Sequence, residues 1–521
     1  MPVQDGARTV REAGAGYGAS WESLRGHRTP EWFRDAKFGI WAHWGPQSVP
    51  RMGDWYARHL YGPYAGSEDW ERERAARFTA AHRTRYGHPS QVGHKDICHL
   101  WRAEHWDPEA LIEEYRNAGA RYFMSMGAHC DNFDLWDSAH QPWNATRVGP
   151  GTNVVGRWEA AARAAGLRFG VSAHFGSWTW RWLDAAFGAD SGGPMRGVPY
   201  DGHLTAADGA GTWWEGLDPA RLYGPVRRPG DRPTSAFVAD FYGRMRDLVR
   251  QHRPDIIYFD DARMPFTAGS VCPATPAVLG RTDPGLDFLA WYYNQAAGWG
   301  RPDSAGIATI KRVPEPDRQA VMLDVERGAV DRAHADPWQN CTCLGEWFYK
   351  DGLALKTAAQ VVQLLADVVS KNGNLLLSVP QRPDGTIDEE ERATLGAIGR
   401  WLGDNGEAIY GTRPWAVCGE GPGGPRPGQE REEAYRYTAA DIRFTTRGDR
   451  LYAILLGWPA DRQAVITTLG KRAGAHAFEP SRVELLGVGG ALPWDRDDRG
   501  LRVRLPDVAP GQPAYCLRIS R

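Results

Sequence analysis

The sequence predicts an α/β fold in which a (β/α)8-like TIM barrel is followed by a C-terminal antiparallel β-sandwich. From about residue 36 to 380, short apolar runs rich in Val, Ile, Tyr and Phe alternate with amphipathic stretches, as a parallel barrel requires. From about residue 435 onward the pattern changes to period two, which is typical of antiparallel strands. The 521 residues also exceed what one hydrophobic core usually holds, so we expect two modules.

Eight apolar runs are the expected barrel strands, at residues 38–44, 121–127, 168–174, 255–260, 288–294, 321–326, 341–348 and 374–379. Stretches with helical spacing accompany them at 107–120, 154–166, 236–252, 357–373 and 389–403. Three connections are rich in Gly, Pro and Trp and are longer than a structural link needs, at 46–106, 177–235 and 295–320. Long loops of this kind often carry function, so we expect them to build a site.

The expected domains are an N-terminal extension at 1–30, the barrel at 31–415 and the β-sandwich at 416–521. Residues 418–433 are rich in Pro and Gly, a composition that predicts a flexible surface loop between the two modules. The period-two segments that follow it predict a small antiparallel module, most simply a sandwich that shields the barrel.

Charge and hydropathy exclude several classes of partner. Lys and Arg total 62 against 64 Asp and Glu, and no block of like charge is present, so we expect neither nucleic acid nor a membrane surface as a partner. No segment reaches 18 uninterrupted apolar residues, and the first residues lack the apolar core of a signal peptide. We therefore expect a soluble, cytoplasmic protein. Composition gives no indication of the oligomeric state.

The cysteines predict neither a disulfide framework nor a metal centre. Seven Cys are scattered along the chain, and only Cys341 and Cys343 lie close together. This pair could ligate a metal, but no second Cys or His pair at zinc spacing accompanies it, and alternate positions on a buried strand explain it equally well. We expect no metal and no cofactor.

Polar residues at the carboxyl ends of barrel strands converge on one pocket. Five expected strands end in such residues, which are His43 with Trp44, His129 to Asp131, His174, Asp260 with Asp261, and Asp324 to Glu326. A single His or Asp at a strand end is often structural, for example as a helix cap. Five such ends in one barrel instead predict a functional site.

The fourth strand ends in two adjacent aspartates, and only one of them can face the pocket. Side chains alternate along a strand, so Tyr258 and Asp260 share one face and Asp261 lies on the other. We expect Asp260 in the pocket and Asp261 as a cap or loop anchor. A second carboxyl group is needed to protonate a leaving group, and Glu326 is the best-placed candidate, with Glu346 as its rival. The alternative for Glu326 is a structural ion pair with Arg327 or another cation.

Aromatic residues around the same strand ends predict a saccharide or glycoside substrate. A sugar presents hydroxyl groups on its edge and C–H groups on its faces, so its site combines hydrogen-bonding groups with aromatic walls. The chain holds 24 Trp. The aromatic candidates include Trp44, Trp55, Tyr56 and Trp347.

Several segments together resemble the alpha-L-fucosidases of glycoside hydrolase family 29. They are WFRDAKFGIWAHWGPQSVP at 32–50, DWYARHLY at 54–61, AGARYFMSMGAHCDNFDLWDS at 118–138, PWNA at 142–145, RPDIIYFDD at 253–261 and the region 368–415. The resemblance spans roughly residues 30 to 415. It implies a retaining exo-glycosidase that releases terminal alpha-L-fucose through a covalent glycosyl-aspartate intermediate, with carboxyl groups about 5 to 5.5 Å apart and no metal.

The resemblance also implies roles for individual residues. Asp260 matches the nucleophile of the family, and Tyr258 matches the aromatic position two residues before it. His43 and His129 match pocket histidines, and Trp55 matches the tryptophan of an acidic-Trp-Tyr motif. The acid/base glutamate of the family lies at poorly preserved positions, so the choice between Glu326 and Glu346 stays open.

Two departures from the family pattern bear on specificity. Cys130 stands where a second His is common, and Asp54 stands where the longer Glu is frequent. A thiol is a much weaker hydrogen-bonding group than an imidazole, so a closely related L-sugar, such as an alpha-L-galactoside, is an alternative to fucose. Two other functions stay open. One is a carbohydrate-binding protein on a decayed glycosidase barrel, and the other is a glycosidase-like enzyme that acts on a decorated natural product.

Overall fold

The computed structural model describes residues 16–63, 68–279, 283–301, 303–425, 431–472, 478–507 and 511–521. Eight parallel strands follow one another in chain order and close into a barrel, because the last strand pairs with the first. The barrel strands are β1 (Phe38–Ala42), β2 (Tyr122–Ala128), β3 (Arg168–Ala173), β4 (Ile256–Phe259), β5 (Ile307–Ile310), β6 (Met322–Glu326), β7 (Trp338–Cys343) and β8 (Gly373–Ser378). The predicted fold class is confirmed.

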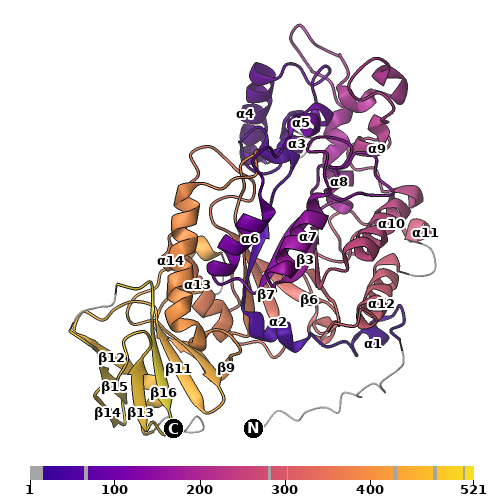
Figure 1. Ribbon diagram of the computed structural model, residues 1–521. Coiled ribbons are helices and arrows are strands. Elements are labelled where there is room, and N and C mark those ends of the chain that lie inside the picture. Colours follow the sequence, from indigo (N-terminus) through magenta and orange to yellow (C-terminus); the bar gives the residue numbers. More distant parts are fainter. Residues whose placement is uncertain are drawn as a thin grey trace.

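Helices surround the barrel and fill its long connections (Figure 1). Several begin at a side-chain cap, such as Asn153, Thr234 and Thr357, which satisfies amide groups of the first turn. None of the described helices is both long and apolar enough to cross a membrane. The helices are α1 (Trp21–Leu24), α2 (Glu31–Ala36), α3 (Tyr56–His59), α4 (Asp69–Arg85), α5 (His94–Leu100), α6 (Pro108–Asn117), α7 (Val154–Ala164), α8 (Ser177–Trp182), α9 (Pro219–Tyr223), α10 (Ser235–His252), α11 (Pro276–Leu279), α12 (Pro284–Ala297), α13 (Ala358–Ser370) and α14 (Glu389–Asn405).

The expected fifth strand at 288–294 was wrong. These residues lie within α12, which begins at the cap Asp283 with Pro284 in its first turn. The apolar run is the buried face of this helix, because Leu286, Leu289 and Tyr293 recur at helical spacing and are buried. The true strand β5 has four residues and lies in the region expected to be the third long insertion, 295–320.

The other two long insertions form a cap at one end of the barrel. Helices α3, α4 and α5 of the first insertion and α8 and α9 of the second lie together at the top of Figure 1. They contact one another, since the short α3 helix packs against α4 and against the 3-10 turn that follows α8. This cap covers the carboxyl ends of the strands, where the site is expected.

The C-terminal module consists of two antiparallel sheets. The order is β13-β16-β11-β10-β9 in the larger sheet and β12-β15-β14 in the smaller. Apolar side chains of both sheets share one core. The strands are β9 (Arg413–Glu420), β10 (Ile442–Arg447), β11 (Arg450–Leu455), β12 (Gln463–Ile466), β13 (Arg482–Leu485), β14 (Trp494–Asp497), β15 (Gly500–Arg504) and β16 (Tyr515–Ser520).

The expectation of a surface loop over 418–433 was wrong at both ends. Residues 418–420 belong to β9, which also crosses the expected boundary at 415/416. At the other end, Arg431 forms a β-bridge with Gly328 of the barrel, and Glu432 is buried. Residues 426–430 lie outside the described part of the chain.

A buried ion cluster joins the two modules. Asp367 of α13 accepts hydrogen bonds from Lys371 Nζ at 2.6 Å and from Arg443 Nε of β10 at 2.5 Å. Burial alone would raise the pKa of Asp367, but the two cations lower it below its usual value. The carboxylate therefore holds two cations that would otherwise be buried without a counter-charge.

We expect Asp367→Asn to lower the free energy of unfolding by about 3 to 5 kcal/mol, because it leaves both cations without a counter-charge. Urea unfolding followed by circular dichroism measures this change. The control is Asp69→Asn, whose carboxylate is exposed and contacts Arg72, and which should cost less than about 1 kcal/mol. Equal losses in the two variants would show that the cluster does not stabilise the junction.

Candidate active site

A cavity of about 250 Å³ opens at the carboxyl ends of the barrel strands, beneath the cap formed by the insertions. Its walls combine aromatic rings with carboxylates, imidazoles and two cations. The lining residues are Trp41, His43, Asp54, Trp55, His129, His174, Trp178, Trp182, Tyr258, Asp260, Lys311, Glu326, Trp347 and Arg431. Nine of them, namely His43, Asp54, Trp55, His129, His174, Tyr258, Asp260, Glu326 and Trp347, were predicted from the sequence.

Asp260 lies directly after β4 and faces the cavity, as the strand alternation predicts. One carboxylate oxygen contacts Lys311 Nζ, and the other lies 3.3 Å from His174 Nδ1. Tyr258, two residues earlier on the same face, places its hydroxyl 3.5 Å from Asp260. The next residue, Asp261, does not line the cavity. Its carboxylate accepts a hydrogen bond from the amide of Val271 at 2.8 Å, which anchors the following loop.

Lys311 connects the two carboxylates of the cavity. It follows β5, and its Nζ contacts Asp260 and also Glu326 Oε2, the latter at 2.6 Å. Burial would raise the pKa of Asp260, but Lys311 and then His174 hold it well below the usual carboxyl value. Burial likewise opposes the charge on Lys311, but Asp260 and Glu326 hold its pKa well above normal. Both groups are therefore charged near neutral pH.

Glu326 and Glu346 differ in their positions. Glu326 ends β6, lines the cavity and shares Lys311 with Asp260. Glu346 does not line the cavity and lies beside Gly53, within the electrostatic reach of Asp54. One ammonium group contacts both Asp260 and Glu326, so the two carboxylates face each other across Lys311 Nζ.

Three histidines form one wall of the cavity. Ring nitrogens of His43, His129 and His174 lie within 4.8 Å of one another, close enough in geometry for a metal ion. Burial, reinforced by the neighbouring imidazoles, lowers the pKa of His43 and of His129 well below normal, so both rings are neutral. A neutral imidazole can donate a hydrogen bond to a hydroxyl group or accept one from it, and it can also ligate a cation.

Asp54 and Trp55 enter the cavity from the first insertion. Trp55 has a left-handed backbone (φ 68°), and its amide donates to Asp54 Oδ1 at 2.8 Å. The same Asp54 oxygen, Oδ1, lies 3.5 Å from His129 Nε2. Burial raises the pKa of Asp54 well above its usual value. The Trp55 ring packs against Trp182 of the second insertion at 4.5 Å between centroids, so the two insertions meet at the cavity.

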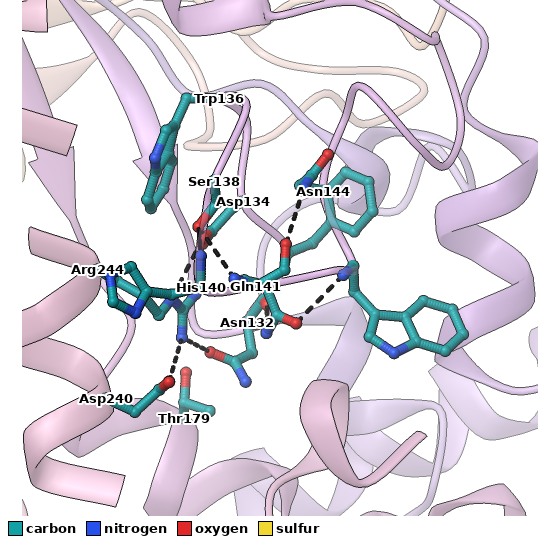
Figure 2. Close-up of polar contacts among 12 residues, drawn as sticks. Asn132, Asp134, Trp136, Ser138, His140, Gln141, Asn144, Thr179, Asp240 and Arg244 are labelled. Atoms are coloured by element: carbon teal, nitrogen blue, oxygen red, sulfur yellow. Dashed lines mark hydrogen bonds and ion pairs between the residues drawn. The ribbon is translucent and has the colours of Figure 1, made fainter. Parts of the chain in front are cut away.

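A buried arginine fixes the loop that follows His129. Figure 2 shows Arg244 of α10 between Asn132, Asp134 and Asp240. Its Nη1 donates to Asn132 Oδ1 at 2.7 Å, and its Nε and Nη2 contact both oxygens of Asp134. Bidentate pairing of this kind restricts geometry. It holds the loop in place although Asn132 has a positive φ of 63°.

Three predicted substrate-binding residues do not line the cavity. Trp44 is buried against Trp101 and Trp106, because strand alternation directs Trp41 and His43 inward and Trp44 outward. Tyr56 of α3 donates its hydroxyl to His82 of α4 within the cap. Cys130 is buried behind His129, with its Sγ 3.9 Å from His129 Nε2. The structure thus places these three outside the cavity lining, and their contact with substrate stays a prediction.

Five cavity residues were not among the predicted site residues, namely Trp41, Trp178, Trp182, Lys311 and Arg431. Lys311 was missed because the fifth strand was misplaced, although a lysine directly after IATI is a strand-end signal once β5 is known. Trp41 shares the face of His43 and could have been found from alternation alone. Arg431 comes from beyond the barrel, and no local pattern marks it.

Comparisons with known proteins point to one family. A family model described as alpha-L-fucosidase matches residues 6–407, and a second, described as the alpha-L-fucosidase C-terminal domain, matches 436–520. The tissue alpha-L-fucosidases of Rattus norvegicus and Homo sapiens are each 25% identical. The alignments cover 97% of this chain and 93% of the rat protein, and 95% and 89% for the human one.

Solved structures show the same architecture. The Thermotoga maritima alpha-fucosidase in complex with fucose is 26% identical, with a TM-score of 0.67 over 96% of this chain and 100% of that one. The same enzyme with a mechanism-based inhibitor gives a TM-score of 0.68. Barrel, C-terminal module and sequence motifs all match one group of proteins. The chain belongs to the alpha-L-fucosidase family, whose members are glycoside hydrolases.

Proposed function

We propose that this protein is a retaining exo-hydrolase that releases a terminal alpha-L-fucose, or a closely related L-sugar, through a covalent bond to Asp260. The observation that carries the proposal is the pair of carboxylates joined by Lys311 inside a Trp-lined cavity. The close approach of Asp260 and Glu326 favours retention, because inverting enzymes keep their carboxyl groups about 6.5 to 9.5 Å apart to admit a water molecule.

In the first step, Asp260 attacks the anomeric carbon of the sugar while the bond from that carbon to the leaving-group oxygen breaks. Glu326 donates a proton to this oxygen, so the leaving group departs as an alcohol. In this step Glu326 must exchange its contact with the Lys311 ammonium for a hydrogen bond to the leaving-group oxygen. Lys311 keeps Asp260 ionised and therefore nucleophilic until the bond forms.

In the second step, Glu326 acts as the base. It removes a proton from a water molecule, whose oxygen attacks the anomeric carbon and cleaves the ester to Asp260. Asp260 regains its charge beside Lys311 as the sugar leaves. Two displacements at the same carbon restore its original configuration, so the released sugar has the configuration of the substrate.

The remaining cavity residues fit the recognition of one sugar ring. His43, His129 and the Asp54 carboxyl provide hydrogen-bonding groups for hydroxyls. Trp41, Trp178 and Trp347 provide flat apolar walls. The volume of about 250 Å³ is below that of pockets for drug-sized ligands, which favours a single terminal residue and hence exo-action.

We expect Asp260→Asn to lower kcat on 4-nitrophenyl alpha-L-fucoside by about 10³-fold or more, because the amide is a poor nucleophile. Release of nitrophenol measures the rate. The matched control is Asp261→Asn, which changes the neighbouring carboxylate outside the cavity and should keep most of the activity. Loss of activity in the control alone would exclude Asp260 as the nucleophile.

Glu326→Gln tests the acid/base assignment against Glu346→Gln. A general acid contributes about 10² to 10⁴-fold, and its loss matters most when the leaving group is a poor one. We expect Glu326→Gln to slow hydrolysis of an alkyl fucoside far more than that of a dinitrophenyl fucoside. Glu346→Gln should show no such dependence. The reverse result would assign the acid/base role to Glu346.

Lys311→Met should move the acid limb of the pH profile of kcat/KM to higher pH. Lys311 lowers the pKa of Asp260, and Asp260 must be ionised to attack. Removal of the cation raises this pKa, so a larger share of Asp260 is protonated at acidic pH. Initial rates between pH 3 and 8, compared with those of Lys311→Arg, provide the measurement. An unchanged acid limb in Lys311→Met would contradict the role of Lys311.

A further inference from the structure

The segment at residues 431–437 joins the C-terminal module to the edge of the cavity. Arg431 forms a β-bridge with Gly328, and the amide of Glu432 donates to Arg327 O at 2.9 Å. The buried Glu432 carboxylate accepts from Lys356 Nζ at 3.0 Å and from Thr342 Oγ1. These contacts attach the segment to the barrel after β6, through Arg327 and Gly328, and at and after β7, through Thr342 and Lys356.

Further contacts extend this attachment along the segment. The hydroxyl of Tyr435 accepts the amide of Ala329 at 2.9 Å, and Arg327 Nη2 contacts Glu433 at 2.6 Å. The segment is thus held by the backbone bridge at Arg431, the buried carboxylate of Glu432 and the hydroxyl of Tyr435. The position of Arg431 at the cavity is therefore set by packing.

Arg431 is the cation of the cavity that has no assigned partner. Its side chain is exposed, and no hydrogen bond or ion pair joins it to another residue in the described part of the chain. The second cation, Lys311, is already engaged by Asp260 and Glu326. A planar guanidinium with free donors is suited to bidentate binding of a carboxylate, sulfate or phosphate.

The position of Arg431 relative to Glu326 determines which part of a substrate it meets. Glu326 ends β6, and Gly328, two residues later, pairs with Arg431. In the proposed reaction, Glu326 contacts the oxygen of the leaving group. Arg431 therefore lies on the leaving-group side of the cavity, and the sugar lies against the histidine wall.

We propose that Arg431 is a specificity-determining residue that binds an anionic group on the leaving group of the substrate. This inference rests on the proposed function and extends it by naming the chemical class of the aglycone. Glu326 does not repel such an anion during the first step, because it then carries the proton that it donates. The C-terminal module is thus part of the substrate site, through one residue at its border with the barrel.

The test compares two substrates that differ in the charge of the leaving group. They are 4-nitrophenyl alpha-L-fucoside and an analogue with a carboxylate on the aryl ring, assayed with wild type, Arg431→Gln and Arg499→Gln. Arg499 is an exposed arginine of the same module that does not line the cavity. For each protein, kcat/KM for the anionic substrate is divided by kcat/KM for the neutral one. Comparison of this ratio between proteins cancels the intrinsic difference in reactivity between the two leaving groups.

We expect Arg431→Gln to lower this ratio about tenfold, or about 1.4 kcal/mol, mainly through KM, because the variant loses a hydrogen bond to a charged group. Arg499→Gln should leave it unchanged, and added salt should lower it in wild type but not in Arg431→Gln. An unchanged ratio in Arg431→Gln, or an equal fall in Arg499→Gln, would overturn this proposal alone. Failure of wild type to hydrolyse either substrate faster than Asp260→Asn would overturn the proposed function as well.

Discussion

The site depends on one ammonium group held between two carboxylates. Asp260 follows β4 and Glu326 ends β6, and two like charges this close repel each other. Lys311, from the strand between them in the barrel, contacts both and makes their close approach stable. The two acids also have different surroundings, because Asp260 has an additional contact with His174. A nucleophile and an acid/base need such a difference if they are to act in turn.

The remaining architecture supplies the walls around this cluster. The closed barrel brings strand ends that are far apart in the sequence to one edge, and the two insertions meet over them where Trp55 packs on Trp182. Arg244 fixes the loop after His129 from outside the cavity (Figure 2). The C-terminal module packs against α13 through the Asp367 cluster and provides Arg431. The barrel, the two insertions and the segment that begins at Arg431 therefore each contribute residues to the cavity.

Much of the fold and of the site could be predicted from the sequence, because side chains alternate along a strand and because site residues follow the carboxyl ends of barrel strands. Strand alternation places Tyr258 and Asp260 in the cavity, and the strand-end rule finds His129 and His174. The fifth strand failed because it has four residues, whereas the apolar face of α12 imitates a strand, and Lys311 was lost with it. Trp44 was misplaced because the alternation was not applied to β1. Arg431 reaches the cavity through a contact between residues about a hundred positions apart in the sequence, which a single sequence does not encode in any local pattern.

The central claim is that the Asp260 carboxylate forms a bond to the anomeric carbon of the sugar. A fluorinated fucosyl donor, such as 2-deoxy-2-fluoro-fucosyl fluoride, slows the second step more than the first and allows the intermediate to accumulate. Intact-mass measurement followed by peptide mapping then locates the sugar. The account predicts one fluorofucosyl group per chain, on the peptide that contains Asp260, and none in Asp260→Asn. A label on another residue, or turnover without any label, would contradict it.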